Sequence, residues 1–212
     1  MGTRAPLQVG TKLRAFRMKD SARRLYKKAI REWDRSNCAT AIELMDSARK
    51  IAPLGPPLEM IFAECLDHVG QYDAAERILR RLTGAANRPL GWRQLGKLLE
   101  ERGCFAEALR CFQRCTRLEP DDTRNWVYKG CMLVRMGRLR EGERSHRRAT
   151  QCGHGDVDEA WLNVGLCLRA RRKYSEAAAC FSRALRIDPK YVAAKKALRD
   201  VCQAMSVVQE RR

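Results

Sequence analysis

Cysteine and histidine are the residues of this 212-residue chain whose chemistry suggests a reactive site. Ten cysteines and three histidines would suffice for metal ligation, disulfide bonding or nucleophilic catalysis. No Cys-x-x-Cys pair occurs, and the closest spacings are those of Cys104, Cys111 and Cys115. Zinc sites usually bring their ligands in close pairs, so we expect no bound metal. No secretory signal is evident, so we expect free thiols rather than disulfides.

The histidines do not form a catalytic arrangement either. His68, His146 and His154 lie far apart in the sequence, with no recurring acid or nucleophile beside them. The segment Cys152-Gly-His154-Gly is the one local arrangement that could ligate a metal, but an irregular connector between repeats is the simpler interpretation. A Walker-type loop, a dinucleotide glycine fingerprint and a metalloprotease helix motif are all absent. We therefore predict that the chain is not an enzyme and needs no cofactor.

A repeat organises the elements that carry these residues. The stretch Trp92-Arg-Gln-Leu-Gly96 recurs as Trp126-Val-Tyr-Lys-Gly130 and as Trp161-Leu-Asn-Val-Gly165, so the tryptophans are 34 and then 35 residues apart. The second half also recurs, because residues 105–112 (FAEALRCF) match residues 174–181 (YSEAAACF). Apolar residues at steps of three and four predict two amphipathic helices in each copy.

This W-x-x-L-G, A-x-x-x-F and P pattern, with its 34-residue period, resembles the tetratricopeptide repeat (TPR) family. The resemblance implies an all-α fold, a right-handed α-α superhelix (solenoid) of stacked antiparallel helix pairs. The predicted repeats and flanking segments are residues 1–21 (a basic N-terminal arm), 22–55 and 56–88 (two divergent repeats), 89–122, 123–157 and 158–191 (three clear repeats) and 192–212 (a C-terminal capping helix).

Small residues indicate how these helices should pack. A glycine in a helix interior lowers helix stability by about 1 kcal/mol relative to alanine. The predicted helices nevertheless contain Gly96, Gly130 and Gly165, so we expect a neighbouring helix to approach too closely there for a side chain. The glycines at 103 and 137 mark the turns between paired helices. His146 occupies the position of a buried phenylalanine in the neighbouring copies, so we expect a packed imidazole. Most cysteines occupy positions suited to small apolar core residues.

Function is then expected on the hollow face lined by the first helices, where members of the resembled family bind extended or helical peptides. The groove-lining residues that we predict lie off the packing stripe of those helices, and they are Arg93, Lys97, Glu100, Arg124, Val127, Tyr128, Cys131, Val134, Arg135, Glu159, Leu162, Asn163, Leu166 and Arg169. Such a surface suits a protein or peptide partner with apolar anchors and acidic flanks. The alternative is that its apolar members are covered by the C-terminal helix or by a second copy of the chain.

One branch of the family clamps the carboxylates of chaperone C-termini with lysine and asparagine side chains. Arg93 and Lys97 stand where the first helix of such a clamp has Lys and Asn, but Tyr128 takes the next asparagine position. Glu159 replaces a lysine that the clamp requires, and its charge would repel a carboxylate. We therefore do not predict a chaperone clamp.

The net charge of +18 supports a second hypothesis. Positive charge is concentrated at the ends of the chain, since residues 1–55 carry +8 and residues 123–212 carry +11. Basic clusters such as 171–173 and 195–196 could contact phosphates, which makes an RNA- or ribosome-associated scaffold the alternative function. Residues 1–19 are basic and acid-free, typical of a flexible tail, although a transit peptide has a similar composition. No apolar run is long enough to span a membrane, so we expect a cytoplasmic adaptor. The sequence also leaves open that the chain forms a homo-oligomer.

Overall fold

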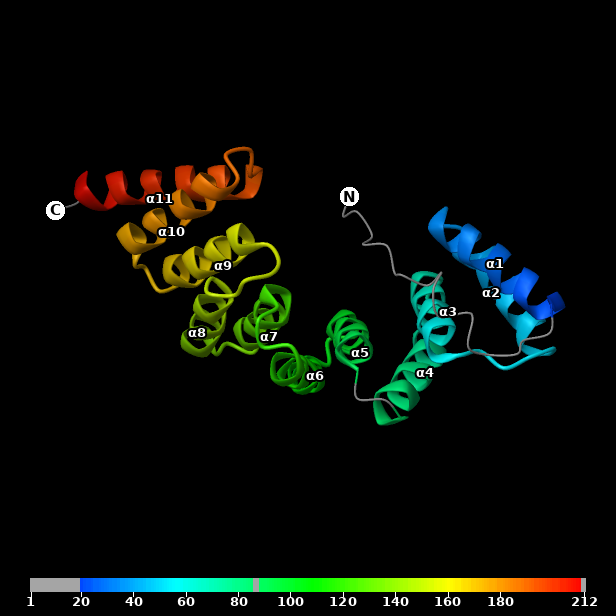
Figure 1. Cartoon of the computed structure of the whole chain (residues 1–212). Helices are drawn as coiled ribbons and strands as arrows, with labels where there is room; N and C mark the ends of the chain where they lie inside the picture. Colours follow the sequence, from blue (N-terminus) through cyan, green and yellow to red (C-terminus); the bar gives the residue numbers. More distant parts are fainter. Residues whose placement is uncertain (1–19, 86–87, 211–212) are drawn as a thin grey trace. The chain divides into compact units, whose positions relative to one another are not determined.

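The computed structural model describes residues 20–85 and 88–210, and in that part of the chain every regular element is a helix (Figure 1). Two units are distinguished, Met1–Asn87 and Arg88–Arg212. The helices of the first unit are α1 (Asp20–Asp34), α2 (Cys38–Arg49), α3 (Pro56–His68) and α4 (Tyr72–Ala85). Those of the second unit are α5 (Pro89–Glu101), α6 (Phe105–Leu118), α7 (Thr123–Arg135), α8 (Leu139–Ala149), α9 (Val157–Ala170), α10 (Tyr174–Ile187) and α11 (Val192–Glu210). The predicted all-α fold of stacked helix pairs is confirmed. The basic arm predicted at residues 1–21 lies almost wholly outside the described residues.

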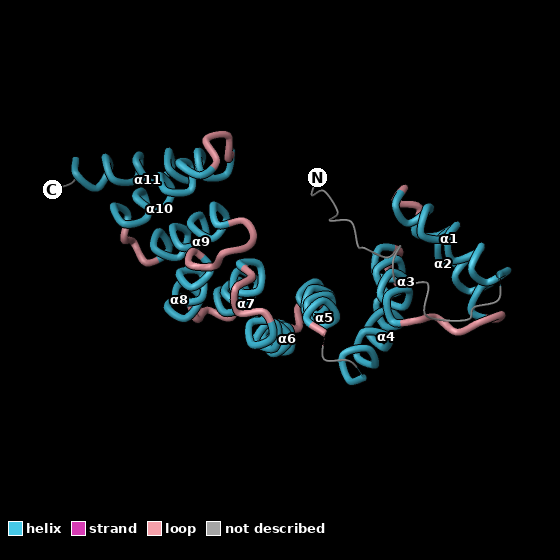
Figure 2. Tube along the Cα trace, viewed as in Figure 1, coloured by secondary structure: helices cyan, strands magenta, loops and turns pink. Residues whose placement is uncertain are grey.

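Short turns join the two helices of each pair (Figure 2). Gly70, Gly103 and Gly137 occupy equivalent places in three of these turns and have φ values of +82°, +74° and +76°. A residue without Cβ adopts this left-handed conformation at little cost, which explains the glycines. The corresponding turns of the first and last pairs hold Ser36 and Arg172 at φ of 63° and 59°. The backbone geometry is therefore repeated even where the sequence has no glycine.

Three helix glycines of the second unit, Gly96, Gly130 and Gly165, are sites of close helix approach, as the sequence predicted. A Cβ atom added to Gly96 would lie 2.8 Å from the ring of Phe112 in the paired helix. At Gly130 the added atom would lie 2.5 Å from the imidazole of His146, and Gly165 meets the ring of Phe181 in the same way. Each pair is thus fixed by an aromatic ring or imidazole that packs directly onto backbone.

The repeated tryptophan has a specific partner in the same pair. The guanidinium of Arg148 lies 5.8 Å from the ring centroid of Trp126, and that of Arg183 lies 4.6 Å from the centroid of Trp161. Both are within the range of cation–π attraction. The divergent second repeat has Glu59 at the tryptophan position, and Arg81 pairs with it at 2.6 Å. The contact between the first and second helix is therefore kept, with an ion pair replacing the cation–π contact.

The first unit is held by its own buried stripe. On α1 the side chains of Ala22, Tyr26, Ala29 and Trp33 are buried at helical spacing. Tyr26 donates its hydroxyl proton to the Ala52 carbonyl oxygen at 2.5 Å, which fixes α1 to the segment that follows α2. The divergent sequence of this unit is thus compatible with the same paired-helix packing.

The last helix, α11, covers the apolar face of the final pair. Its buried residues Ala194, Ala197 and Val201 belong to one cluster with Phe181 of α10 and Leu168 of α9. Leu162 and Leu166 of α9 also belong to this cluster or pack against it. A solenoid needs such an end helix because its terminal repeat would otherwise expose apolar surface.

All ten cysteines lie in the described part of the chain and are free thiols, most of them buried. Burial raises the pKa of Cys115 and Cys131 to about 12 and that of Cys167 to about 11. These thiols stay protonated near neutral pH and act as small apolar groups, as their positions in the repeat indicated. Among the described residues, no group of three or more His, Cys, Asp or Glu side chains could hold a metal ion. No described helix is both long enough and apolar enough to cross a bilayer.

The glycine contact can be tested with Gly96→Ala. The new methyl group would overlap the Phe112 ring, so we expect the free energy of unfolding to fall by about 1–3 kcal/mol, measured by urea denaturation. Gly84→Ala is the matched control, because Gly84 lies in helix α4 and a Cβ there meets no atom within 4 Å. It should cause no loss of stability. Equal stability of the Gly96→Ala variant and the wild type would contradict this account of the packing.

The buried imidazole predicts a pH dependence. His146 is 1% exposed, and burial lowers the pKa of its side chain from 6.5 to about 4. Between these values the unfolded chain takes up a proton that the folded chain does not, so stability falls as the pH falls, by up to about 1.4 kcal/mol per pH unit. His146→Phe restores the residue type of Phe112 and Phe181 and should flatten this part of the profile. Unfolding measured between pH 7 and pH 4 checks this, with His154→Phe, at an exposed site, as the control for loss of an imidazole.

Candidate functional site

A pocket of about 230 Å³ lies on the first helices of the second unit. Its lining comes from α5, α7 and α9, with contributions from α8, and comprises Glu100, Cys131, Val134, Arg135, Leu139, His146, Asn163, Leu166, Cys167 and Ala170. We call this set the first-helix groove. Three consecutive first helices contribute to one concavity because each pair stacks on the next with the same orientation.

The interior of the first-helix groove is apolar in character. The thiols of Cys131 and Cys167 remain protonated because burial raises their pKa values. His146 is neutral near pH 7 because burial lowers its pKa. Val134 and Leu166 are half-buried, so part of each side chain faces the opening. A site of this kind favours apolar side chains and offers no nucleophile.

One edge of the groove carries an ion pair that is partly shielded from solvent. Arg135 Nε lies 3.3 Å from Glu100 Oε1, and the Arg135 guanidinium also lies 5.5 Å from the ring centroid of Phe105. Burial raises the pKa of Glu100, although the charge of Arg135 opposes this shift. The charge of this arginine is therefore largely balanced within the molecule.

Beside the groove, three side chains form a stack. The rings of Phe112 and Tyr128 are stacked with centroids 5.1 Å apart, and Lys97 Nζ lies 5.1 Å from the Tyr128 centroid. Lys97 is exposed and lies above a half-buried tyrosine ring, an arrangement suited to contact with a partner. Neither residue lines the pocket itself, but both lie on the helices, α5 and α7, that form it.

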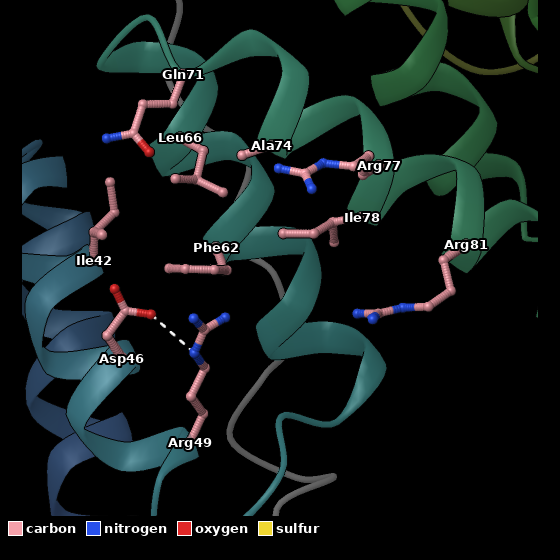
Figure 3. Close-up of a pocket in the computed structure, with 10 residues that line it drawn as sticks. All are labelled: Ile42, Asp46, Arg49, Phe62, Leu66, Gln71, Ala74, Arg77, Ile78 and Arg81. Atoms are coloured by element: carbon pink, nitrogen blue, oxygen red, sulfur yellow. Dashed lines mark ion pairs between the residues drawn. The ribbon is translucent and has the colours of Figure 1, made fainter.

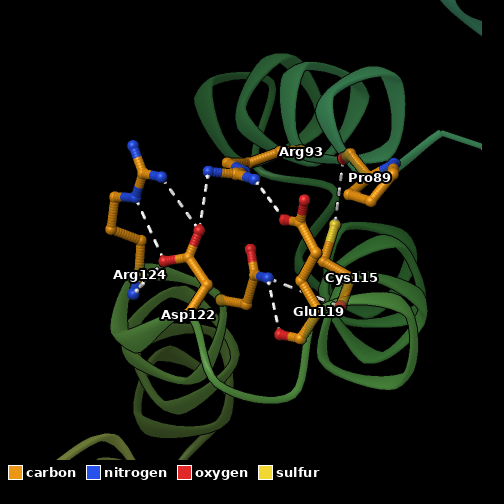
Figure 4. Close-up of polar contacts among 7 residues, drawn as sticks. Pro89, Arg93, Cys115, Glu119, Asp122 and Arg124 are labelled. Atoms are coloured by element: carbon orange, nitrogen blue, oxygen red, sulfur yellow. Dashed lines mark hydrogen bonds and ion pairs between the residues drawn. The ribbon is translucent and has the colours of Figure 1, made fainter. Parts of the chain in front are cut away.

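The prediction that Arg93 faces a ligand is wrong. Its side chain is buried, with the residue 8% exposed, and it donates to Glu119 at 2.8 Å and to Asp122 at 3.3 Å (Figure 4). Arg124, a second predicted groove residue, bonds the same Asp122 carboxylate at 2.9 Å. Burial alone would raise the pKa of Asp122, but the bonds from Arg124 and the charge of Arg93 lower it. Arg93 thus connects α5 to the segment before α7, and Arg124 pairs with the N-cap residue of its own helix, so both guanidinium groups have partners within the chain.

Two apolar residues predicted to line the groove are also buried. Val127 is 3% exposed and packs with Ala149 and Ala160, so the following repeat covers it. Leu162 is 8% exposed and belongs to the cluster that includes α11. Leu162 therefore fits the alternative that the C-terminal helix covers apolar members of the predicted groove, whereas Val127 is covered by residues of α8 and α9. Arg169 lies 3.7 Å from Asp200 of α11, so it too has an internal partner.

The structure therefore keeps part of the predicted set together. Cys131, Arg135, Asn163 and Leu166 all line one pocket, as do Glu100 and Val134. Sequence reasoning missed the contributions of His146, Leu139, Cys167 and Ala170. The repeat alignment assigned His146 and most of the cysteines to packed positions, although a packed residue can also border a cavity.

Comparisons with known proteins agree with the repeat. The tetratricopeptide repeat profile matches residues 89–122 and 158–191. Among curated proteins, human protein O-mannosyl-transferase TMTC1 is 25% identical over 154 residues, which is 70% of this chain and 17% of that protein. The chain thus spans about a sixth of the length of that relative.

Solved structures share the fold at low sequence identity. A tetratricopeptide repeat protein from Parabacteroides merdae has a TM-score of 0.75 at 17% identity, covering 89% of this chain and 75% of that one. MamA from Desulfovibrio magneticus has a TM-score of 0.73 at 15% identity, covering 82% and 99%. YrrB, described as a TPR protein with an unusual peptide-binding site, has a TM-score of 0.65 at 18% identity, covering 82% and 90%. Tetratricopeptide repeats indicate a protein-interaction scaffold. The profile matches show tetratricopeptide repeats at residues 89–122 and 158–191, and the tandem helix pairs with their glycine contacts continue the same packing between them.

Proposed function

We propose that this chain is a non-enzymatic adaptor that binds an extended or helical segment of a partner protein in the first-helix groove. The supporting observation is the groove itself, a concave apolar site to which three consecutive first helices contribute. YrrB, which has a peptide-binding site, provides a precedent for this fold. The transferase activity named for the longer human relative is not part of the function proposed for this chain.

The volume of the groove, about 230 Å³, suits a few side chains of a peptide segment. One or two apolar anchors could enter it while the rest of the segment lies across α5, α7 and α9. Asn163 at its border has an amide that can bond the backbone of such a segment.

The flanks of the partner segment are expected to be only mildly acidic. Arg93, Arg124, Arg135 and Arg169 each have a carboxylate partner within the chain. Lys97, which is exposed above the Tyr128 ring, is the predicted basic residue best placed for an acidic group on a partner. We therefore assign most of the affinity to apolar anchors and the orientation of the segment to Lys97 and Asn163.

The RNA-associated scaffold is the competing function. This function would depend on the basic clusters, but some of their side chains already form ion pairs within the chain. Arg171 pairs with Glu143, and Lys173 pairs with Glu176. Arg148 and Arg183 are also held against tryptophan rings. Because these contacts reduce the cation surface available to phosphates, the protein partner is favoured.

The test uses a photo-crosslinking residue at position 163 of the full chain to capture the partner, whose binding is then measured by titration. Asn163→Arg should fill the groove and weaken binding by about tenfold or more. Ser182→Arg is the matched control, because it adds the same side chain at an exposed position on α10 and should leave the affinity within about twofold.

Two results would count against the proposal. One is equal affinity of the wild-type chain and the Asn163→Arg variant for the captured partner. The other is complete release of that partner by ribonuclease, which would favour the RNA-associated scaffold instead.

A further inference from the structure

A second concave surface, in the first unit, has a chemistry unlike that of the first-helix groove. Residues of α2, α3 and α4 line two adjoining cavities of about 510 and 480 Å³. The cavities share Arg49, Phe62, Ile78 and Arg81, and Arg77 borders the larger one. We call this surface the arginine cleft. Each of its cavities is large enough to hold several side chains of a bound segment.

Figure 3 shows the guanidinium groups of Arg49, Arg77 and Arg81 directed toward the space around Phe62. They come from two helices, with Arg49 on α2 and the other two on α4. The floor between them is apolar, and its accessible part is the half-buried Ile78 of α4, with the Phe62 ring of α3 buried beneath at 4% exposed. Cations therefore surround an apolar surface, a combination that neither a purely apolar nor a purely ionic ligand would satisfy.

The charges of the arginine cleft are not balanced. Arg49 Nε lies 2.9 Å from Asp46 Oδ1, and Arg81 Nη2 lies 2.6 Å from Glu59 Oε1. Arg77 bonds a backbone carbonyl, with its Nε 3.3 Å from the Asp73 oxygen. Lys50 also lines the smaller cavity. Four basic and two acidic side chains thus line the cleft, an excess of two positive charges.

The paired arginines also retain capacity for a ligand. A guanidinium group carries five N–H donors, and one carboxylate uses at most two of them. The side chains of Arg49 and Arg81 are 54% and 64% exposed, so the other donors face solvent. The Arg49 guanidinium lies 5.5 Å from the Phe62 centroid, which holds it at the edge of the apolar floor. A carboxylate placed there could bond an arginine while a neighbouring apolar side chain contacts the floor.

Charge also decides which occupant fits. Residues 1–19 contain five basic side chains and no acid, so the N-terminal arm of this chain is repelled. A second copy of the chain, with a net charge of +18, is disfavoured in the same way. A segment with carboxylates beside apolar side chains complements both the rim and the floor.

We propose that the arginine cleft of the first unit binds an acidic segment of a partner protein in which Asp or Glu residues flank one or two large apolar side chains. The carboxylates bond Arg77, Arg49 and Arg81, and the apolar side chains contact Ile78 and the small exposed part of Phe62. This site is independent of the first-helix groove and adds a second, electrostatically selective contact to the adaptor.

The experiment selects binders from a display library of random twelve-residue peptides on the full chain, with counter-selection on the Arg49→Ala/Arg77→Ala variant. Enriched peptides should carry an excess of Asp and Glu next to Leu, Phe or Met. A synthetic copy should bind the variant about tenfold more weakly than the wild type. Changing its acids to amides, or its apolar residues to Ser, should each weaken binding by a similar factor.

The Lys27→Ala/Lys28→Ala variant is the matched control, since it removes two positive charges from exposed positions of α1 in the same unit. It should leave the affinity within about twofold. In the wild type the Arg77 side chain donates to a backbone carbonyl oxygen on its own helix, so Arg77→Ala should not lower thermal stability. This single substitution should weaken peptide binding by roughly threefold.

Three outcomes would overturn the proposal. One is the absence of enriched peptides, or enrichment without acidic residues. Another is an equal loss of affinity in the Lys27→Ala/Lys28→Ala variant, which would mean that peptide binding depends on the net charge of the chain and not on the arginine cleft. The third is a heparin oligosaccharide or a twelve-nucleotide RNA that binds more tightly than the selected peptide and is lost in the same arginine variant. That result would assign the cleft to polyanions.

Discussion

In each of the three pairs of the second unit, a ring lies directly against a helix glycine. Phe112 meets Gly96, His146 meets Gly130 and Phe181 meets Gly165, with no room for a methyl group in any of the three. This contact sets how near the two helices lie, and it repeats with the period of the sequence. Because interiors pack at the density of crystals, fixing this separation also fixes which neighbouring side chains are covered and which face an opening.

The same constraint shapes the candidate site. His146 packs on Gly130 with one part of its ring and borders the first-helix groove with another. An imidazole rather than a phenyl ring therefore stands at the groove wall, kept neutral by the burial that the packing demands. The groove is thus a consequence of the repeat, and its particular chemistry comes from where the middle repeat departs from its neighbours.

The fold could be predicted from the sequence because its signals are local. Glycine spacing, helical periodicity and turn glycines each depend on a few adjacent residues. The site was harder to predict, since burial of Val127 and Leu162 depends on helices more than 30 residues away in sequence, α9 and α11. Arg93 was misassigned for a related reason, because its partners Glu119 and Asp122 belong to the segment that leads into the next repeat. Ser36 and Arg172 show the converse, a conserved turn geometry without the residue that signals it.

Net charge was equally incomplete as a guide to function, because it counts cations without their partners. In the second unit many arginines are matched by carboxylates or placed over tryptophan rings, and the first-helix groove is left nearly neutral. In the first unit the arginine cleft retains an excess of positive charge around an apolar floor. Desolvated apolar contacts mainly set affinity, whereas unbalanced charge mainly sets association rate and partner choice. If both proposed sites bind partner segments, the chain would recognise two different segments, and a partner carrying both would gain avidity wherever its linker can reach both sites.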